Sequence, residues 1–152
     1  VCLSISFPNY KMFYKLNKDN QSDWAVLILD ASILWDLDCA FCYTNAASSV
    51  ISRIPLPQRK TVEALFQMFQ NGENPSREEL AIPANYTKDP QAEVLVFDTI
   101  PIKYIRGVNF QSTVAMRTWQ NNNSYSGNIP LVATDTYFQP RCDWQFWKSN
   151  RE

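Results

Sequence analysis

Short stretches of this chain alternate between apolar and polar residues, and Gly, Pro, Asn or Asp residues separate one stretch from the next. Alternation with a period of two is typical of a strand that buries one face. The same stretches are rich in β-branched and aromatic residues, which favour strands. The pattern predicts strands at residues 1–7, 13–16, 24–29, 92–97, 107–111, 112–119 and 131–134.

Residues 58–70 have a helical period instead. Their apolar side chains recur at spacings of three or four residues, and Gly72 supplies a stop signal after them. Residues 30–37 and 101–105 each predict a single helical turn, the second beginning with a proline. Prolines, asparagines, glycines and charges predict loops at residues 71–90 and 121–128.

The chain has the length and composition of one folded domain, with 152 residues, 45% hydrophobic content and 19% charge. Turns rather than helices join most of the predicted strands. We therefore expect an α+β fold of mixed, mainly antiparallel sheets with few helices, formed by residues 1–152 as a single domain.

A net charge of −1 and a pI of about 5.5 give no overall basic field, so any contact with nucleic acid has to be local. Apolar runs such as residues 25–29 are far shorter than the roughly 20 residues that span a membrane. Four irregularly spaced cysteines do not form a disulfide scaffold. We expect a soluble, cytoplasmic protein. Because Val1 is not a methionine and already begins a predicted strand, we also expect further residues upstream.

Two absences exclude whole classes of site. Without histidine the chain holds no Ser-His-Asp or Cys-His catalytic unit and no zinc site that uses histidine. Three widely separated glycines form neither G-x-G-x-x-G nor a P-loop. Cys39 and Cys42 have the spacing of metal ligands, but a single pair favours buried thiols, and we predict no metal.

Gln91 and Glu93 stand two residues apart in the predicted strand at residues 92–97. Residues at this spacing share a face, so the two polar side chains project together while Ala92, Val94 and Val96 form an apolar face. A solvent-facing polar pair is the ordinary interpretation of such a pattern. The sequence around this pair favours a functional interpretation instead.

The segment Gln91-Ala92-Glu93-Val94-Leu95-Val96, followed by Ile100-Pro101-x-x-Tyr104-Ile105, resembles the signature of DarT-type DNA ADP-ribosyltransferase toxins. Pro8-Asn9-Tyr10-Lys11-Met12-Phe13-Tyr14 is similar to a family strand with Pro, Met and an aromatic residue. Phe41-Cys42-Tyr43-Thr44-Asn45-Ala46-Ala47 resembles a further family segment, and Pro140-Arg141-Cys142-Asp143-Trp144 is a weaker match. The resemblance spans most of the chain and implies an ADP-ribosyltransferase-like fold.

This resemblance implies that Glu93 is the catalytic carboxylate of an NAD-consuming enzyme. A fixed carboxylate stabilises the oxocarbenium-like charge that forms on ribose as nicotinamide leaves, and it can accept the proton of the attacking base. Gln91, on the same face, is expected to orient the ribose or the base. Thr44 and Asn45 are candidates to hydrogen-bond NAD or the base, with a capping or Asx interaction as the alternative.

Six further candidates follow from the family-like segments. Met12 and Tyr14 are candidates to line the NAD pocket. Tyr10 and Trp144 offer rings on which bases stack, and Lys11 and Arg141 offer charges for DNA. For each of them an ordinary position in the core or on a solvated surface is the alternative.

The expected reaction moves ADP-ribose from NAD to a base of single-stranded DNA. DarT-like proteins modify thymine or guanine, and residues 10–14 and 44–47 differ from the thymine-modifying pattern, which favours guanine. The expected partner is an antitoxin with ADP-ribosyl-glycohydrolase activity.

A protein or RNA acceptor and a non-catalytic nucleic-acid-binding module are the alternatives. The family's NAD-holding histidine and arginine are expected before Val1. Their absence from the printed chain fits a fragment, a structure lacking its first part, or a divergent member.

Overall fold

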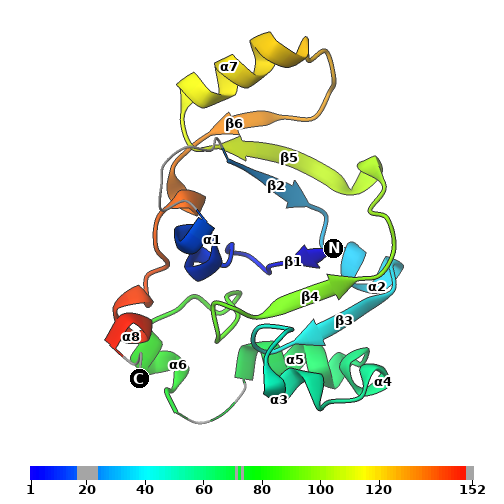
Figure 1. Ribbon diagram of the computed structural model, residues 1–152, viewed down its shortest axis with the longest axis vertical. Coiled ribbons are helices and arrows are strands. Elements are labelled where there is room, and N and C mark those ends of the chain that lie inside the picture. The colour runs from blue at the N-terminus through cyan, green and yellow to red at the C-terminus, as the bar shows by residue number, and fades with distance from the viewer. Residues whose placement is uncertain (17–23, 71, 73, 150–152) are drawn as a thin grey trace.

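Two small sheets lie one above the other in the computed structural model, which describes residues 1–16, 24–70, 72 and 74–149 (Figure 1). Each sheet has three strands. The lower sheet carries Glu93, and short helices cover its outer side, whereas the upper sheet carries one long helix at the far end of the molecule.

The lower sheet has the strand order β1-β4-β3 and is antiparallel throughout. Its strands are β1 (Cys2–Leu3), β3 (Cys39–Cys42) and β4 (Glu93–Val96). Ala92, Val94 and Val96 are at most 2% exposed and alternate with half-buried residues, as the sequence pattern predicts. Strand β3 escaped prediction because all four of its residues are buried, which removes the alternation that marks a strand with one wet face.

The upper sheet has the order β2-β5-β6. Strands β2 (Ala25–Leu29) and β5 (Ile105–Phe110) pair antiparallel, and β6 (Leu131–Ala133) joins β5 in parallel. Parallel neighbours need a crossover connection, and α7 (Thr113–Asn123) supplies it. All three strands confirm predictions from the sequence, and the fold is α+β with mostly antiparallel sheets.

Short helices surround the lower sheet: α2 (Ile33–Asp36), α3 (Ser49–Ser52), α4 (Leu56–Arg59), α5 (Val62–Gln70) and α6 (Arg77–Leu80). Helix α5 confirms the predicted helix over most of its range and packs against β3. Its Met68 is fully buried and joins the core cluster that includes Ile33, Phe41 and Val94. Burial of an apolar helix face on a sheet stabilises both elements.

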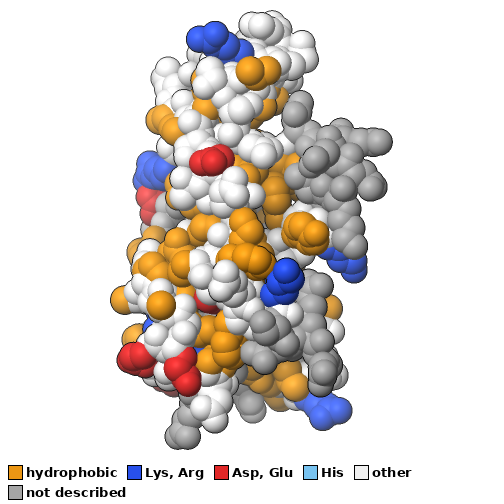
Figure 2. Space-filling model, turned by 90° about the vertical axis from the view of Figure 1, so that its left-hand side faces the viewer, with side chains coloured by type: hydrophobic (Ala, Val, Ile, Leu, Met, Phe, Trp, Pro, Cys, Tyr) orange, Lys and Arg blue, Asp and Glu red, His pale blue; other side chains and the backbone are white. Residues whose placement is uncertain are grey.

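The remaining elements are α1 (Tyr10–Leu16), the 3-10 helices η1 (Ile102–Tyr104) and η2 (Thr136–Phe138), and α8 (Trp144–Ser149). Helices α1 and α8 lie on the same side of the molecule (Figure 1). Turn η1 confirms the helical turn predicted at residues 101–105. Figure 2 shows hydrophobic side chains gathered across the middle of one face. A cavity of about 450 Å³ lies between the sheets, lined by residues of β1 and β2 and by Val94.

The strands predicted at residues 13–16 and 112–119 were wrong, because residues 13–16 and 113–119 are helical and Ser112 is the N-cap of the second helix. Both helices begin at a side chain that caps them. The Asn9 Oδ1 accepts a hydrogen bond from the Met12 amide at 3.1 Å, and the Ser112 Oγ accepts one from the Ala115 amide at 3.1 Å. An N-cap satisfies backbone donors that a strand would leave for a neighbouring strand, so it favours the helix over strand propensity.

The predicted loop at residues 71–90 is more ordered than its composition indicates, although Asn71 and Glu73 lie outside the described residues. Ser76 and Glu79 form a reciprocal capping box that starts α6. Thr87 and Lys88 are 4% and 5% exposed, so the end of this segment is buried rather than superficial. Across the described ranges, no helix combines the length and apolarity that crossing a membrane requires.

Candidate active site around Glu93

Glu93 is the first residue of β4 and lies directly opposite Cys42, the last residue of β3. Residues directly opposite in an antiparallel pair project to the same face, with Cβ atoms roughly 5 Å apart. Glu93 is half-buried and Cys42 is fully buried. The carboxylate therefore stands at the open end of a strand pair whose interior is apolar.

A loop after β3 closes over the Glu93 carboxylate. The backbone amide of Ala46 donates a hydrogen bond to the Glu93 Oε2 at 2.8 Å. In the same loop Asn45 accepts one from the Ala47 amide through its Oδ1 at 2.8 Å. The Asn45 side chain thus makes an Asx interaction, the alternative expected from sequence, and the loop brings Thr44 and Asn45 to the segment that carries Glu93.

Gln91 lies in the turn just before β4 and is half-buried, as Glu93 is, while Ala92 between them is 1% exposed. Gln91 precedes β4 and belongs to the turn, so the two-residue period of a strand does not extend to it. The Gln91 amide donates to the Asp89 Oδ1 at 2.7 Å, and the Ala92 amide donates to the Asp89 carbonyl at 3.1 Å. Asp89 therefore fixes the backbone that leads into the strand.

Arg59, at the end of α4, reaches the same strand pair. Its Nη1 lies 3.8 Å from the Cys42 Sγ, across the strands from Glu93. Burial raises the pKa of the Cys42 thiol, the Arg59 hydrogen bond lowers it, and the Glu93 charge raises it. Opposite charges thus act on one neutral thiol. Cys39 is buried too, so the prediction of buried thiols at both positions is confirmed.

Arg141 is not available to DNA as the sequence led us to expect. It is 2% exposed, and its Nη1 and Nη2 donate to the carbonyls of Thr87 and Lys88 at 2.7 and 2.9 Å. Its Nε donates to the Asp143 Oδ1 at 2.7 Å, and its Nη2 bonds the second oxygen. The guanidinium is planar and forked, which suits this two-point pairing and directs its donors inward.

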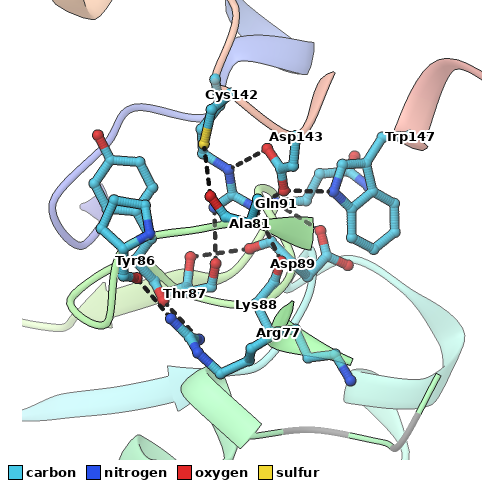
Figure 3. Close-up of polar contacts among 12 residues, drawn as sticks. Arg77, Ala81, Tyr86, Thr87, Lys88, Asp89, Gln91, Cys142, Asp143 and Trp147 are labelled. Carbon is cyan, nitrogen blue, oxygen red and sulfur yellow. Dashed lines mark hydrogen bonds and ion pairs between the residues drawn. The ribbon is translucent and has the colours of Figure 1, made fainter. Parts of the chain in front are cut away.

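Figure 3 shows Thr87, Lys88, Asp143 and Trp147 gathered at this buried ion pair. The indole Nε1 of Trp147, on α8, donates to the Asp143 Oδ2 at 2.8 Å. Thr87 in turn donates through its Oγ1 to the Asp89 carbonyl at 3.0 Å. A continuous set of hydrogen bonds therefore connects α8 with the turn that precedes Gln91 and Glu93.

A second arginine holds the same turn from its other end. The Nη1 of Arg77 donates to the carbonyls of Phe69 and Tyr86 at 2.9 and 3.0 Å, and its Nη2 donates to that of Pro83 at 2.6 Å. Backbone carbonyls buried without a partner destabilise a fold. The two arginines satisfy several of these carbonyls and make the irregular segment before β4 a defined structure.

The other predicted residues lie on α1 and α8. Met12 and Tyr14 are 51% and 68% exposed. The Nζ of Lys11 lies 4.6 Å from the ring centre of Trp147, which joins α1 to α8, and Tyr10 is half-buried on α1. Trp144 is half-buried as well. Among the described contacts, none links Met12, Tyr14 or Trp144 directly to Glu93.

Sequence reasoning missed Ala46, Arg59 and Asp89 as neighbours of the candidate site. Ala46 contributes only a backbone amide, so its residue type carries no signal. Arg59 stands 34 positions before Glu93 in a segment with no recognised motif, and only the folding of α4 onto β3 brings it close. Asp89, two residues before Gln91, fits an Asx turn, which the sequence alone could have indicated.

A comparison with family models matches residues 6–146 to DarT, described as ssDNA thymidine ADP-ribosyltransferase. The match covers nearly the whole chain and includes every segment that lines the Glu93 site. No curated protein matches the chain. On the strength of the family match, this chain belongs to the DarT family of ssDNA thymidine ADP-ribosyltransferases.

Proposed function

We propose that this protein transfers ADP-ribose from NAD to a base of single-stranded DNA, releases nicotinamide, and uses Glu93 as its catalytic carboxylate. The observation that carries the proposal is the seating of Glu93 at the start of β4, held by the Ala46 amide at 2.8 Å within the family-like segments. A carboxylate fixed in advance needs no reorganisation when positive charge develops nearby.

The proposed chemistry breaks the bond between the ribose C1′ and nicotinamide, and the bonding electron pair leaves with the nicotinamide nitrogen. One Glu93 oxygen accepts a hydrogen bond from a ribose hydroxyl and stabilises the positive ribose. A base nitrogen then attacks C1′, and the proton it loses passes to the Glu93 carboxylate. The products are ADP-ribosylated DNA, free nicotinamide and one proton.

Neighbouring residues have supporting roles in this proposal. Gln91 orients the ribose or the base from the turn just before β4. Thr44 hydrogen-bonds NAD from the loop that contains Ala46, and Asn45, whose Oδ1 accepts from the Ala47 amide, does so through its Nδ2 donor. The exposed Met12 and Tyr14 on α1 line the outer part of the NAD site.

Tyr10, Lys11 and Trp144 supply the DNA contacts in this proposal. Lys11 and Trp144 belong to α1 and α8, which the cation–π contact of Lys11 with Trp147 holds together. An antitoxin that removes ADP-ribose is the proposed partner.

The family description and the residue pattern favour different acceptor bases. The family description names thymidine, whereas differences at residues 10–14 and 44–47 favour guanine. The family match covers both segments, so we place thymidine first and treat guanine as the competing outcome. Oligonucleotides that contain only one of the two bases separate them directly.

The decisive experiment incubates the protein with labelled NAD and defined oligonucleotides, alongside Glu93→Gln. This variant keeps the size of the side chain and one acceptor oxygen, and it removes the negative charge. We expect label on DNA with the wild type and a loss of at least a hundredfold with the variant, about 2.7 kcal/mol of transition-state stabilisation. Label that appears on protein or RNA alone would refute the DNA acceptor, and undiminished transfer by Glu93→Gln would remove Glu93 from the mechanism.

A further inference from the structure

Arg59 is a cation without a carboxylate partner beside the candidate catalytic residue. Over the described ranges, no Asp or Glu oxygen lies within ion-pair distance of its guanidinium. Its neighbour Lys60 differs, because Lys60 is paired with Asp38 at 2.6 Å. The charge of Arg59 is therefore uncompensated at the end of α4 that packs on β3.

One donor of Arg59 is also left unsatisfied. Its Nε is fully buried and has no hydrogen-bond partner among the described residues. The Nη1 has only a long contact with the Cys42 sulfur, which is a weak acceptor. Buried donors of this kind are rare in folded proteins and call for an explanation, such as a bound ion or ligand.

The position of Arg59 relative to Glu93 follows from the strand register. Cys42 lies directly opposite Glu93 on one face, and Arg59 contacts the Cys42 sulfur. Both charges act on that thiol, Arg59 lowering and Glu93 raising its pKa, against the larger rise that burial causes. A cation and an anion thus both act on one thiol, and no ion pair between them is among those of the described residues.

We propose that Arg59 binds a substrate phosphate next to Glu93, which makes the strand pair β3–β4 a combined ribose and phosphate site. This inference rests on the function proposed above. Guanidinium groups bind phosphate with two parallel hydrogen bonds and are favoured wherever phosphate is recognised. The terminal Nη1 and Nη2 donors of Arg59 have no oxygen partner among the described contacts, and a phosphate supplies such acceptors.

The substrates of the proposed reaction have the matching chemistry. In NAD the ribose that loses nicotinamide carries the pyrophosphate a few bonds from C1′. In DNA the acceptor nucleotide carries a phosphodiester at a similar remove from its base. Either group places a phosphate near the reacting ribose, so a carboxylate at the ribose and a guanidinium at the phosphate match both cases.

The test compares Arg59→Gln with Arg117→Gln. The control makes the same change of charge at an exposed arginine on α7, at the far end of the molecule (Figure 1). Binding of NAD is measured by calorimetry, and binding of a labelled single-stranded oligonucleotide by fluorescence anisotropy, each with the other substrate absent. Thermal unfolding checks that both variants are folded, and Arg59→Lys tests whether a point charge is sufficient.

We expect Arg59→Gln to weaken the binding of at least one substrate about tenfold. Arg117→Gln should bind both substrates within twofold of the wild type. If NAD binding weakens and DNA binding does not change, Arg59 binds the pyrophosphate of NAD. If DNA binding weakens and NAD binding does not change, Arg59 binds a phosphodiester of the DNA. The slope of log affinity for DNA against log salt should then fall by about 0.7, the value of one single-strand phosphate contact. Weakening of both places Arg59 between the two substrates.

Unchanged binding of both substrates by a folded Arg59→Gln overturns the phosphate contact. If the wild type still labels DNA, the proposed function survives that result. A wild type that neither binds NAD and DNA nor labels DNA overturns the proposed function and the Arg59 contact together.

Discussion

The backbone amide of Ala46 lies 2.8 Å from a carboxylate oxygen of Glu93, although 47 residues separate the two along the chain. The backbone donor occupies the Oε2 atom of Glu93 and leaves the other carboxylate oxygen for the substrate. Because a backbone amide does not titrate, this donor is present at every pH. The loop that supplies this amide is therefore part of the proposed catalytic unit.

Replacement of Ala46 tests that relationship. Ala46→Pro removes the N–H donor, and we expect turnover to fall at least tenfold, in line with the roughly 1.5–3 kcal/mol that a hydrogen bond to a charged group contributes. Ala46→Val keeps the N–H and is the matched control. Steady-state kinetics with NAD and oligonucleotide measure the effect, and equal turnover of the two variants would show that the amide has no role in catalysis.

Removing one member of the buried Arg141–Asp143 pair should destabilise the fold strongly. Arg141→Ala leaves the Asp143 carboxylate buried without its partner, and we expect a loss of about 3–5 kcal/mol in the free energy of unfolding. Lys60→Ala breaks the more exposed pair with Asp38 and should change that free energy by about 1 kcal/mol at most. Urea unfolding at neutral pH measures both, and similar losses would contradict the structural role of the buried pair.

The four thiols should fall into two classes. Cys2 and Cys142 are exposed, whereas Cys39 and Cys42 are buried, and burial raises the pKa of both buried thiols. Since the thiolate is the reactive form, Cys2 and Cys142 should react quickly with a thiol reagent and the buried pair only after unfolding. Mass spectrometry with and without denaturant counts the modified cysteines. Fast labelling of Cys42 in the folded protein would contradict its place in the core.

Asp30 should make stability sensitive to acid. The Ser32 amide and the Arg106 guanidinium lower the pKa of Asp30 to about 2. A carboxyl group with a lowered pKa in the folded state contributes stability above its unfolded pKa, and this contribution is lost as pH falls through the folded pKa. The difference in melting temperature between the wild type and Asp30→Asn should therefore stay constant near neutral pH and shrink from about pH 4 to about pH 2. A constant difference down to pH 2 would contradict the lowered pKa.

The two wrong strands show the limit of local patterns in this chain. Residues 112–119 contain Val, Thr and Trp, which favour strands, yet the Ser112 cap and the need to link two parallel strands make them α7. Strand β3 was not predicted, because all four of its residues are buried and its sequence therefore lacks the alternation of apolar and polar residues. Cross-strand partners and caps decided each case.

The sequence alone determined the strand that carries Glu93, the alternation that buries Ala92, Val94 and Val96, and the family-like segments. These features depend on neighbours in the chain, so short-range patterns express them. Only the tertiary structure decided that the Ala46 amide binds Glu93, that Arg59 contacts Cys42 opposite Glu93, and that Arg141 pairs with Asp143. Most of these contacts join residues that are far apart in the chain. Packing between elements brings such residues together, and because no local sequence pattern encodes that packing, the contacts could not be predicted.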